Sequence, residues 1–275
     1  MSEVSMLLDD PELTRRSPGE EFALAHARNG PKAVVELRAA ISDLFPPAKR
    51  RPRFTVRHLL RKAVVDADEV TVFTERATNV APDDAAPEWE FEVGSEVARV
   101  QTIRAAVRVP PEILADPAAL AAFVDFRLLV RLGTAENDVL LNGTDEIRGL
   151  LRTPGLRRRE AAGGTAETLL ATAALCEWYG GSADGIVMHP DDWWPLVNDG
   201  AFLERLAVQG VKVSRTRMVP AGTALVGDFT AAATLLDRRA STIRLDGDTL
   251  VAEIREGLAV HLPGHFVFAA LPGAR

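Results

Sequence analysis

The feature that most constrains this chain is the stretch 69–110, in which apolar residues recur at every second position. These apolar residues lie on both sides of a loop, 81–87, that is rich in Ala, Pro and Asp; they are Val70, Val72, Trp89, Phe91 and Val93. The pattern predicts two long strands joined by an irregular tip, with one apolar face and one acidic face. A two-stranded ribbon is not stable alone in water. We therefore expect the ribbon to lie on another surface, in the same chain or in a neighbouring one.

The composition allows a large globular core. The chain has 275 residues, of which 47% are hydrophobic and 26% charged. Its net charge of −7 gives no reason to expect the whole surface to bind nucleic acid. The single cysteine, Cys176, excludes an intrachain disulfide. The sequence has no run of about 18 apolar residues of the kind that would indicate a membrane span. The N-terminus lacks the features of a signal peptide, so we expect a soluble, cytoplasmic protein.

A helix is predicted over 31–45, after a lightly packed lead-in over 1–30. Asn29 is its predicted cap, and Pro46 and Pro47 end it because proline cannot continue the hydrogen-bond ladder. Its apolar residues recur at helical spacing; they are Val34, Leu37, Ala40, Ile41 and Leu44.

A second, much longer helix is predicted to begin at Asp116, with Pro117 at its first position, and to run to about Leu140. The region that follows, from Thr165 to about Val226, alternates helices and short strands. The tail is rich in strands and contains a hairpin that turns at Asp246-Gly247. These elements are segregated rather than arranged as βαβ units, so the fold class is α+β.

Candidate catalytic residues are few. His189 lies near Asp191 and Asp192, a set that could begin a metal site and serve a metal-dependent hydrolase. The structural alternative, which we favour, is that both aspartates lie in the first turn of a helix, where the dipole stabilises negative charge. His261 and His265 have no acid close in sequence. We expect no catalytic residue, no cofactor and no metal.

Two basic runs, 49–53 and Arg157–Arg159, could contact phosphate, but such runs are usually solvated loops. Cys176 lies in a predicted helix beside Trp178, so we interpret it as a buried thiol rather than a nucleophile.

The order of the elements resembles a known family. The likeness is carried by several segments, which are 107–114 with Asp116-Pro117, 136–143, 147–151, 185–193, Gly227-Asp228-Phe229 with Leu236-Asp237-Arg238, and 260–268. Together they resemble the Hong Kong 97-type major capsid fold, which tailed-phage capsid proteins share with the encapsulin nanocompartments. The resemblance covers about residues 52–272.

The resemblance implies a division of the chain into named parts. These are an N-terminal arm that faces the lumen (1–51), a lead-in (52–65), an extended loop (66–107), a peripheral domain with a spine helix (108–164), an axial domain (165–225) and a β-rich return (226–275). By this likeness the ribbon residues Val70, Val72, Trp89, Phe91 and Val93 contact a neighbouring subunit. The helix residues Val34, Leu37, Ile41 and Leu44 then face the interior and receive cargo.

The implied function is that of a self-assembling icosahedral shell subunit whose main partner is itself. We expect an encapsulin-type compartment that encloses a cargo protein in the cytoplasm; the alternative is a phage or prophage major capsid protein that packages DNA in a virion. The founding phage crosslinks its shell through a lysine of the extended loop. Here no lysine lies between Lys62 and Lys212, so we expect a non-covalent shell.

Overall fold

The computed structural model describes residues 16–37, 55–76 and 92–273. The chain forms two compact units, each assembled from segments distant in sequence. Unit 1 comprises Met1–Pro52, Thr102–Glu136 and Asp237–Glu256, and unit 2 comprises Arg53–Gln101, Asn137–Leu236 and Gly257–Arg275. These boundaries differ from those of the parts that the resemblance implies, which stay a prediction. In the described ranges, no helix is long and apolar enough to cross a membrane.

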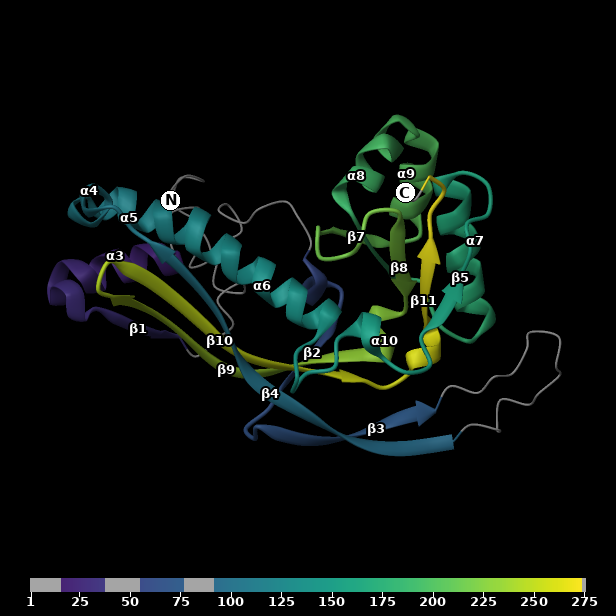
Figure 1. The fold of residues 1–275 in the computed structure, drawn as a ribbon, viewed down its shortest axis with the longest axis horizontal. Helices are drawn as coiled ribbons and strands as arrows, with labels where there is room; N and C mark the ends of the chain where they lie inside the picture. Colours follow the sequence, from purple (N-terminus) through teal and green to yellow (C-terminus); the bar gives the residue numbers. More distant parts are fainter. Residues whose placement is uncertain (1–15, 38–54, 77–91, 274–275) are drawn as a thin grey trace, which may run out of the picture. The chain divides into compact units, whose positions relative to one another are not determined.

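In unit 1, helix α3 (Pro18–Asn29) packs beside helix α5 (Pro117–Phe123) (Figure 1). Ser17 begins α3 with a capping box, in which its hydroxyl accepts from the Glu20 N–H and the Glu20 carboxylate accepts from the Ser17 N–H. The two helices approach closely at Gly19, since a Cβ there would overlap the carbonyl oxygen of Ala121. Residues that we expected to be lightly packed therefore form a capped, buried helix.

The predicted helix over 31–45 is wrong in its described part. Val34–Leu37 form strand β1, which pairs antiparallel with strand β9 (Ala233–Asp246). Gly30, with a φ of 58°, ends α3, and the β-branched Val34 and Val35 favour extended backbone after it. Ile41 and Leu44 lie outside the described residues, so a lumen-facing role for this segment stays a prediction.

The predicted long helix is confirmed, with one irregular turn. After the short α4 (Pro111–Ala115), the carboxylate of Asp116 accepts from the N–H groups of Ala118 and Ala119 and begins α5. The backbone continues through a π-helical segment, η5 (Val124–Leu128), into α6 (Leu129–Asn142). Gly143, with a φ of 72°, follows the last turn.

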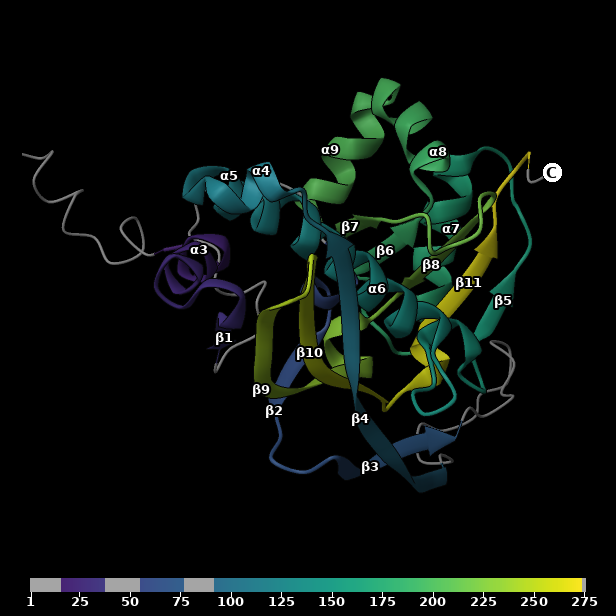
Figure 2. The ribbon, with the colours of Figure 1, turned by 60° about the vertical axis from the view of Figure 1, so that its left-hand side comes forward.

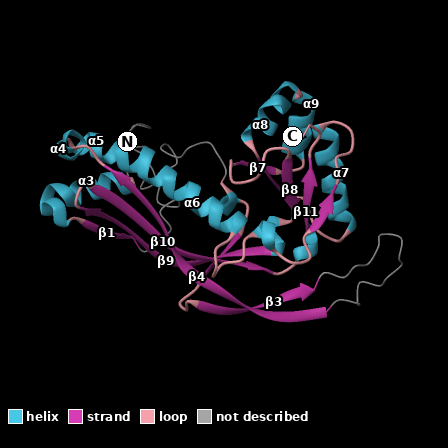
Figure 3. Ribbon diagram, in the orientation of Figure 1, coloured by secondary structure: helices cyan, strands magenta, loops and turns pink. Residues whose placement is uncertain are grey.

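The larger sheet has six strands, five of them hydrogen-bonded in the order β1-β9-β10-β4-β3, while β2 pairs with β9. The strands not yet delimited are β2 (Arg61–Val64), β3 (Glu69–Arg76), β4 (Glu92–Arg108) and β10 (Thr249–Val260). Figure 3 shows the length of β9 and β10, which form the hairpin predicted at Asp246-Gly247.

Unit 2 contains a five-stranded sheet in the order β5-β11-β8-β6-β7 (Figure 2). Its strands are β5 (Arg157–Arg159), β6 (Gly185–Met188), β7 (Lys212–Arg215), β8 (Thr223–Gly227) and β11 (Phe266–Ala270). Helix α7 (Thr165–Trp178) packs on β8 and β11. The sheet combines antiparallel pairs with two parallel pairs, β6–β7 and β5–β11. A βαβ crossover joins β6 to β7 in a fold that is otherwise α+β as predicted.

The remaining helical segments are short. They are η1 (Gly30–Lys32), η4 (Val56–His58), η6 (Leu150–Arg152), α8 (Pro190–Trp193), η7 (Trp194–Asn198), α9 (Gly200–Val208), α10 (Phe229–Ala232) and η8 (Pro263–His265). One core cluster of unit 2 joins η4, the end of α6, α10 and the strand β8 around Phe229 and Phe266. Their rings meet edge to face, with centroids 5.1 Å apart.

Candidate functional site

The predicted ribbon exists as the antiparallel pair β3–β4. Its register places Glu69 opposite Arg99 and Phe73 opposite Ser95. Residues directly opposite one another share a face of the sheet, and alternate residues along a strand point to opposite faces. The register therefore divides the ribbon into two faces, which differ in burial.

One face, called the outer face here, carries Phe73, Val93 and Val97. Their exposed fractions are 70%, 60% and 57%. Glu69 and Arg99 share this face and form an ion pair at 3.1 Å, with both side chains more than half exposed. Three large apolar side chains on one exposed strand pair are unusual for a monomer and typical of a surface that another molecule covers.

The opposite face, called the inner face here, carries Val70, Val72 and Ala98. Val70 and Val72 are partly buried and pack against a small core cluster that contains Leu236 and Ala259. This burial gives the ribbon its support within unit 2. Of the two surfaces expected for the ribbon, the same chain therefore supplies the one under the inner face of the described part of β3 and β4.

Val70 and Val72 thus do not share a face with Val93. The alternation of apolar residues predicted the correct period within each strand, but it does not determine the register between the two strands. Two further residues of the outer face were missed from the sequence: Val97 continues the alternation of Val93, whereas Phe73 directly follows Val72 and lies out of phase with Val70 and Val72. Trp89 and Phe91 lie outside the described residues. Contact with a neighbouring subunit stays a prediction for all five residues named from the sequence.

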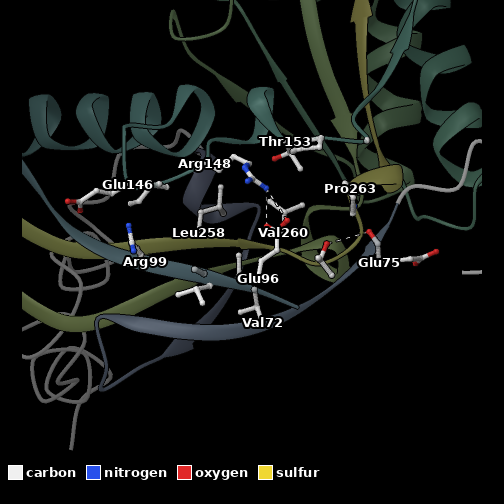
Figure 4. A pocket seen from close by; sticks show the side chains of 17 residues that line it. Val72, Glu75, Glu96, Arg99, Glu146, Arg148, Thr153, Leu258, Val260 and Pro263 are labelled. Atoms are coloured by element: carbon white, nitrogen blue, oxygen red, sulfur yellow. Dashed lines mark hydrogen bonds and ion pairs between the residues drawn. The ribbon is translucent and has the colours of Figure 1, made fainter. Parts of the chain in front are cut away.

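A groove of about 440 Å³ lies along the inner face, and Figure 4 shows the side chains that line it. Val72 and Glu96 line it from the ribbon, and Arg148 and Thr153 line it from the segment that follows α6. The Arg148 Nη1 donates to both carboxylate oxygens of Glu96, at 3.0 and 3.1 Å. This pair links the ribbon to the rest of unit 2, but both side chains are half exposed, so its net contribution to stability is small.

The candidate hydrolase residues have local structural partners. His189 caps α8, where its Nδ1 accepts from the Asp191 N–H at 3.2 Å, and Asp192 accepts from the Gly222 N–H at 2.7 Å. Asp191 lies in the first turn of α8, as the structural alternative predicted. Within residues 16–37, 55–76 and 92–273, no three His, Cys, Asp or Glu side chains are grouped to hold a metal ion. This geometry does not support the metal-dependent hydrolase.

Cys176 is fully buried, and its thiol donates to the carbonyl of His265 at 3.1 Å. Burial, with a smaller effect from the charge of Asp228, raises the pKa of Cys176 to about 12. The thiol therefore stays protonated at neutral pH and is a poor nucleophile, in agreement with the interpretation from the sequence.

The arginine run is a strand rather than a loop. Arg157–Arg159 form β5, which pairs parallel with β11 at the end of its sheet. The Arg157 guanidinium stacks on the ring of Tyr179, 3.2 Å from its centroid, and donates to the carbonyl of Gly264. Burial lowers the pKa of Arg157. These contacts give Arg157 a structural role, and contact of the run with nucleic acid stays a prediction.

Comparison with known sequences gives two matches. The model of the Phage capsid family matches residues 49–198. The major capsid protein of Enterobacteria phage HK97 is 29% identical over 259 residues, an alignment that covers 81% of this chain. The chain spans 66% of the length of that relative.

Solved structures share the fold at low sequence identity. The virus-like particle of Pyrococcus furiosus matches with a TM-score of 0.57 and 13% identity, over 81% of this chain and 92% of that one. The capsid of a native GTA particle matches with a TM-score of 0.56 and 15% identity, over 81% and 94%. A chain of Mycobacterium phage Adephagia also matches at 0.56, with 12% identity, over 81% and 90%. At these identities the likeness concerns the fold alone.

Proposed function

Because this chain belongs to the phage capsid family and has its Hong Kong 97-type fold, we propose that it assembles with identical copies into a closed icosahedral shell. Its role in this proposal is structural, without catalysis of its own. The observation that carries the proposal is the outer face of the ribbon. In this proposal, a neighbouring copy of the same chain covers the outer face.

The energetics favour many identical contacts. Moving an exposed Phe or Val side chain fully out of water contributes about 1.5–3 kcal/mol. A contact of three such residues is weak by itself, because association costs translational and rotational freedom. In a closed symmetric shell each subunit both presents and receives the contact, so modest contacts add up to a stable particle.

The test is a pair of substitutions on the outer face, Phe73→Asp and Val97→Asp. We expect the unmodified chain to elute in the megadalton range and to give round particles by negative-stain microscopy. The double variant should elute as a small species with an unchanged far-UV circular dichroism spectrum, because both side chains are exposed in the single subunit.

Val208→Asp is the matched control, since Val208 is 76% exposed on α9 and lies away from the ribbon in sequence and sheet. Intact particles from the Phe73→Asp, Val97→Asp double variant would contradict the role of the outer face. A small species from the unmodified chain at high concentration would contradict the shell itself.

The relative from Enterobacteria phage HK97 favours a DNA genome as the content of the shell. It is the major capsid protein of a phage, which supports DNA as the cargo here and a virion as the location. The alternative, an encapsulin-type compartment for a protein cargo, is supported by the fold shared with the virus-like particle of Pyrococcus furiosus. Nuclease-treated particles separate the two, since a DNA capsid retains a high absorbance ratio at 260 to 280 nm and a compartment yields a co-purifying protein.

A further inference from the structure

The end of β3 is attached to one residue of unit 2, His261, which directly follows β10. The backbone carbonyl of His261 accepts from the Glu75 N–H at 2.7 Å and from the Thr74 hydroxyl at 3.3 Å. Its imidazole Nδ1 lies 3.1 Å from the carbonyl oxygen of Phe73. Three consecutive ribbon residues, among them the most exposed residue of the outer face, are thus hydrogen-bonded to a single residue.

One tautomer of the ring satisfies all of its hydrogen-bond partners. A carbonyl oxygen only accepts, so Nδ1 must carry the proton that it donates to Phe73. The other nitrogen, Nε2, lies 2.9 Å from the hydroxyl of Thr234. That hydroxyl oxygen already accepts from Nε and Nη2 of Arg61, at 3.3 and 3.1 Å. The hydroxyl group of Thr234 can therefore only donate its proton to Nε2 of His261. Nε2 can accept this hydrogen bond only in a neutral imidazole, because in the imidazolium Nε2 carries a proton of its own.

We propose that His261 is a positioning residue for the outer face: as a neutral imidazole it holds Phe73–Glu75 against unit 2, and protonation of Nε2 weakens this hold. One part of this proposal rests on the proposed function: that the attachment controls how the outer face is presented to a neighbouring subunit. The attachment itself is a property of the single chain.

Protonation disturbs this arrangement in two ways. An N–H at Nε2 would face an oxygen that already accepts two donors, and the Thr234 proton would lose its acceptor. In addition, the imidazolium would lie within about 6 Å of the Arg61 guanidinium, a distance at which like charges repel.

The packed elements bring few charged groups to this ring. They are Arg61 from β2, Glu75 from β3, and Arg157 and His265, which line one small pocket together with Glu75. Residues 229–236, which form α10 and the start of β9, carry none. Glu75, seen near Pro263 at one end of the groove in Figure 4, is the acid among them. His265 lies 4.0 Å from Asp228.

Hydrogen exchange measured by mass spectrometry tests the proposal on the unassembled, full-length chain. Three proteins are compared at pH 7.5 and pH 5.0, an interval in which imidazoles gain their proton. They are the unmodified chain, His261→Gln and His261→Phe. The glutamine amide can donate to Phe73 and accept from Thr234 but cannot be protonated, whereas phenylalanine can do neither.

At pH 7.5 we expect the β3 amides of the unmodified chain and of His261→Gln to exchange alike, and those of His261→Phe about two- to tenfold faster. At pH 5.0 the unmodified chain should exchange faster than His261→Gln by a similar factor. Comparison at one pH cancels the intrinsic dependence of exchange on pH. The buried strand β6 serves as the internal reference, because its exchange should be equal in all three proteins if they are folded.

Equal exchange of the unmodified chain and His261→Gln at pH 5.0 would overturn the proposal, as would equal exchange of His261→Phe and the unmodified chain at pH 7.5. Neither measurement requires particles. A chain that shows the expected exchange but forms no shell would contradict the proposed function and leave the role of His261 intact.

Discussion

At the scale of single residues, Cys176 gives the chain a defined response to alkaline pH. The folded chain keeps this thiol protonated up to a pKa of about 12, whereas an exposed thiol in the unfolded chain ionises near pH 8.5. The stabilisation is therefore complete below about pH 8.5 and is lost as the pH rises towards 12, because the unfolded state alone releases its proton.

We expect the free energy of unfolding to fall by about 2 kcal/mol from this group between pH 8 and pH 10. Urea denaturation at the two pH values measures it. Cys176→Ala is the control, since it removes the thiol and leaves the other titrating groups in place. The same fall in both proteins would show that Cys176 is not its source.

At the scale of elements, two glycines of unit 1 predict opposite effects of the same substitution. Gly19→Ala forces a Cβ against the backbone of α5, and we expect it to destabilise the chain by about 1–3 kcal/mol. Gly133→Ala adds a Cβ in open space within α6, and we expect a gain of about 0.5–1 kcal/mol from helix propensity. Thermal unfolding measures both effects. A change of the unfolding temperature in the same direction for both variants would contradict the α3–α5 packing.

The elements also show what the sequence could predict. The long helix was found because Asp116-Pro117 is a strong local start signal. The register of the ribbon could not be predicted, because the period of two within each strand does not determine which residues pair across the two strands. The helix expected over 31–45 is wrong in its described part, because the β-branched Val34 and Val35 favour extended backbone despite the helical spacing of the apolar residues. The true helix, α3, has a local signal in Ser17 and Glu20, the two ends of its capping box.

The attachment at His261 could not be predicted from the sequence for a different reason. Its partners come from β2, β3 and β9, and only the tertiary structure brings Arg61, Phe73 and Thr234 to one imidazole. A histidine without an acid near it in sequence gave no signal of this role.

At the scale of the whole molecule, the chemistry of the chain predicts a shell without covalent crosslinks. No lysine lies between Lys62 and Lys212, and Cys176 is buried. We expect purified particles, boiled in SDS without reductant, to give one band at the mass of a single chain, 29.7 kDa. A ladder of multiples would contradict this prediction.

The buried thiol also makes the chain a convenient scaffold for conjugation. A cysteine introduced at any exposed position would be the sole thiolate-forming group at neutral pH, so maleimide reagents would modify that position and spare Cys176. If the chain forms shells, dyes or ligands could then be displayed at one chosen point per subunit, with a spacing set by the symmetry of the particle.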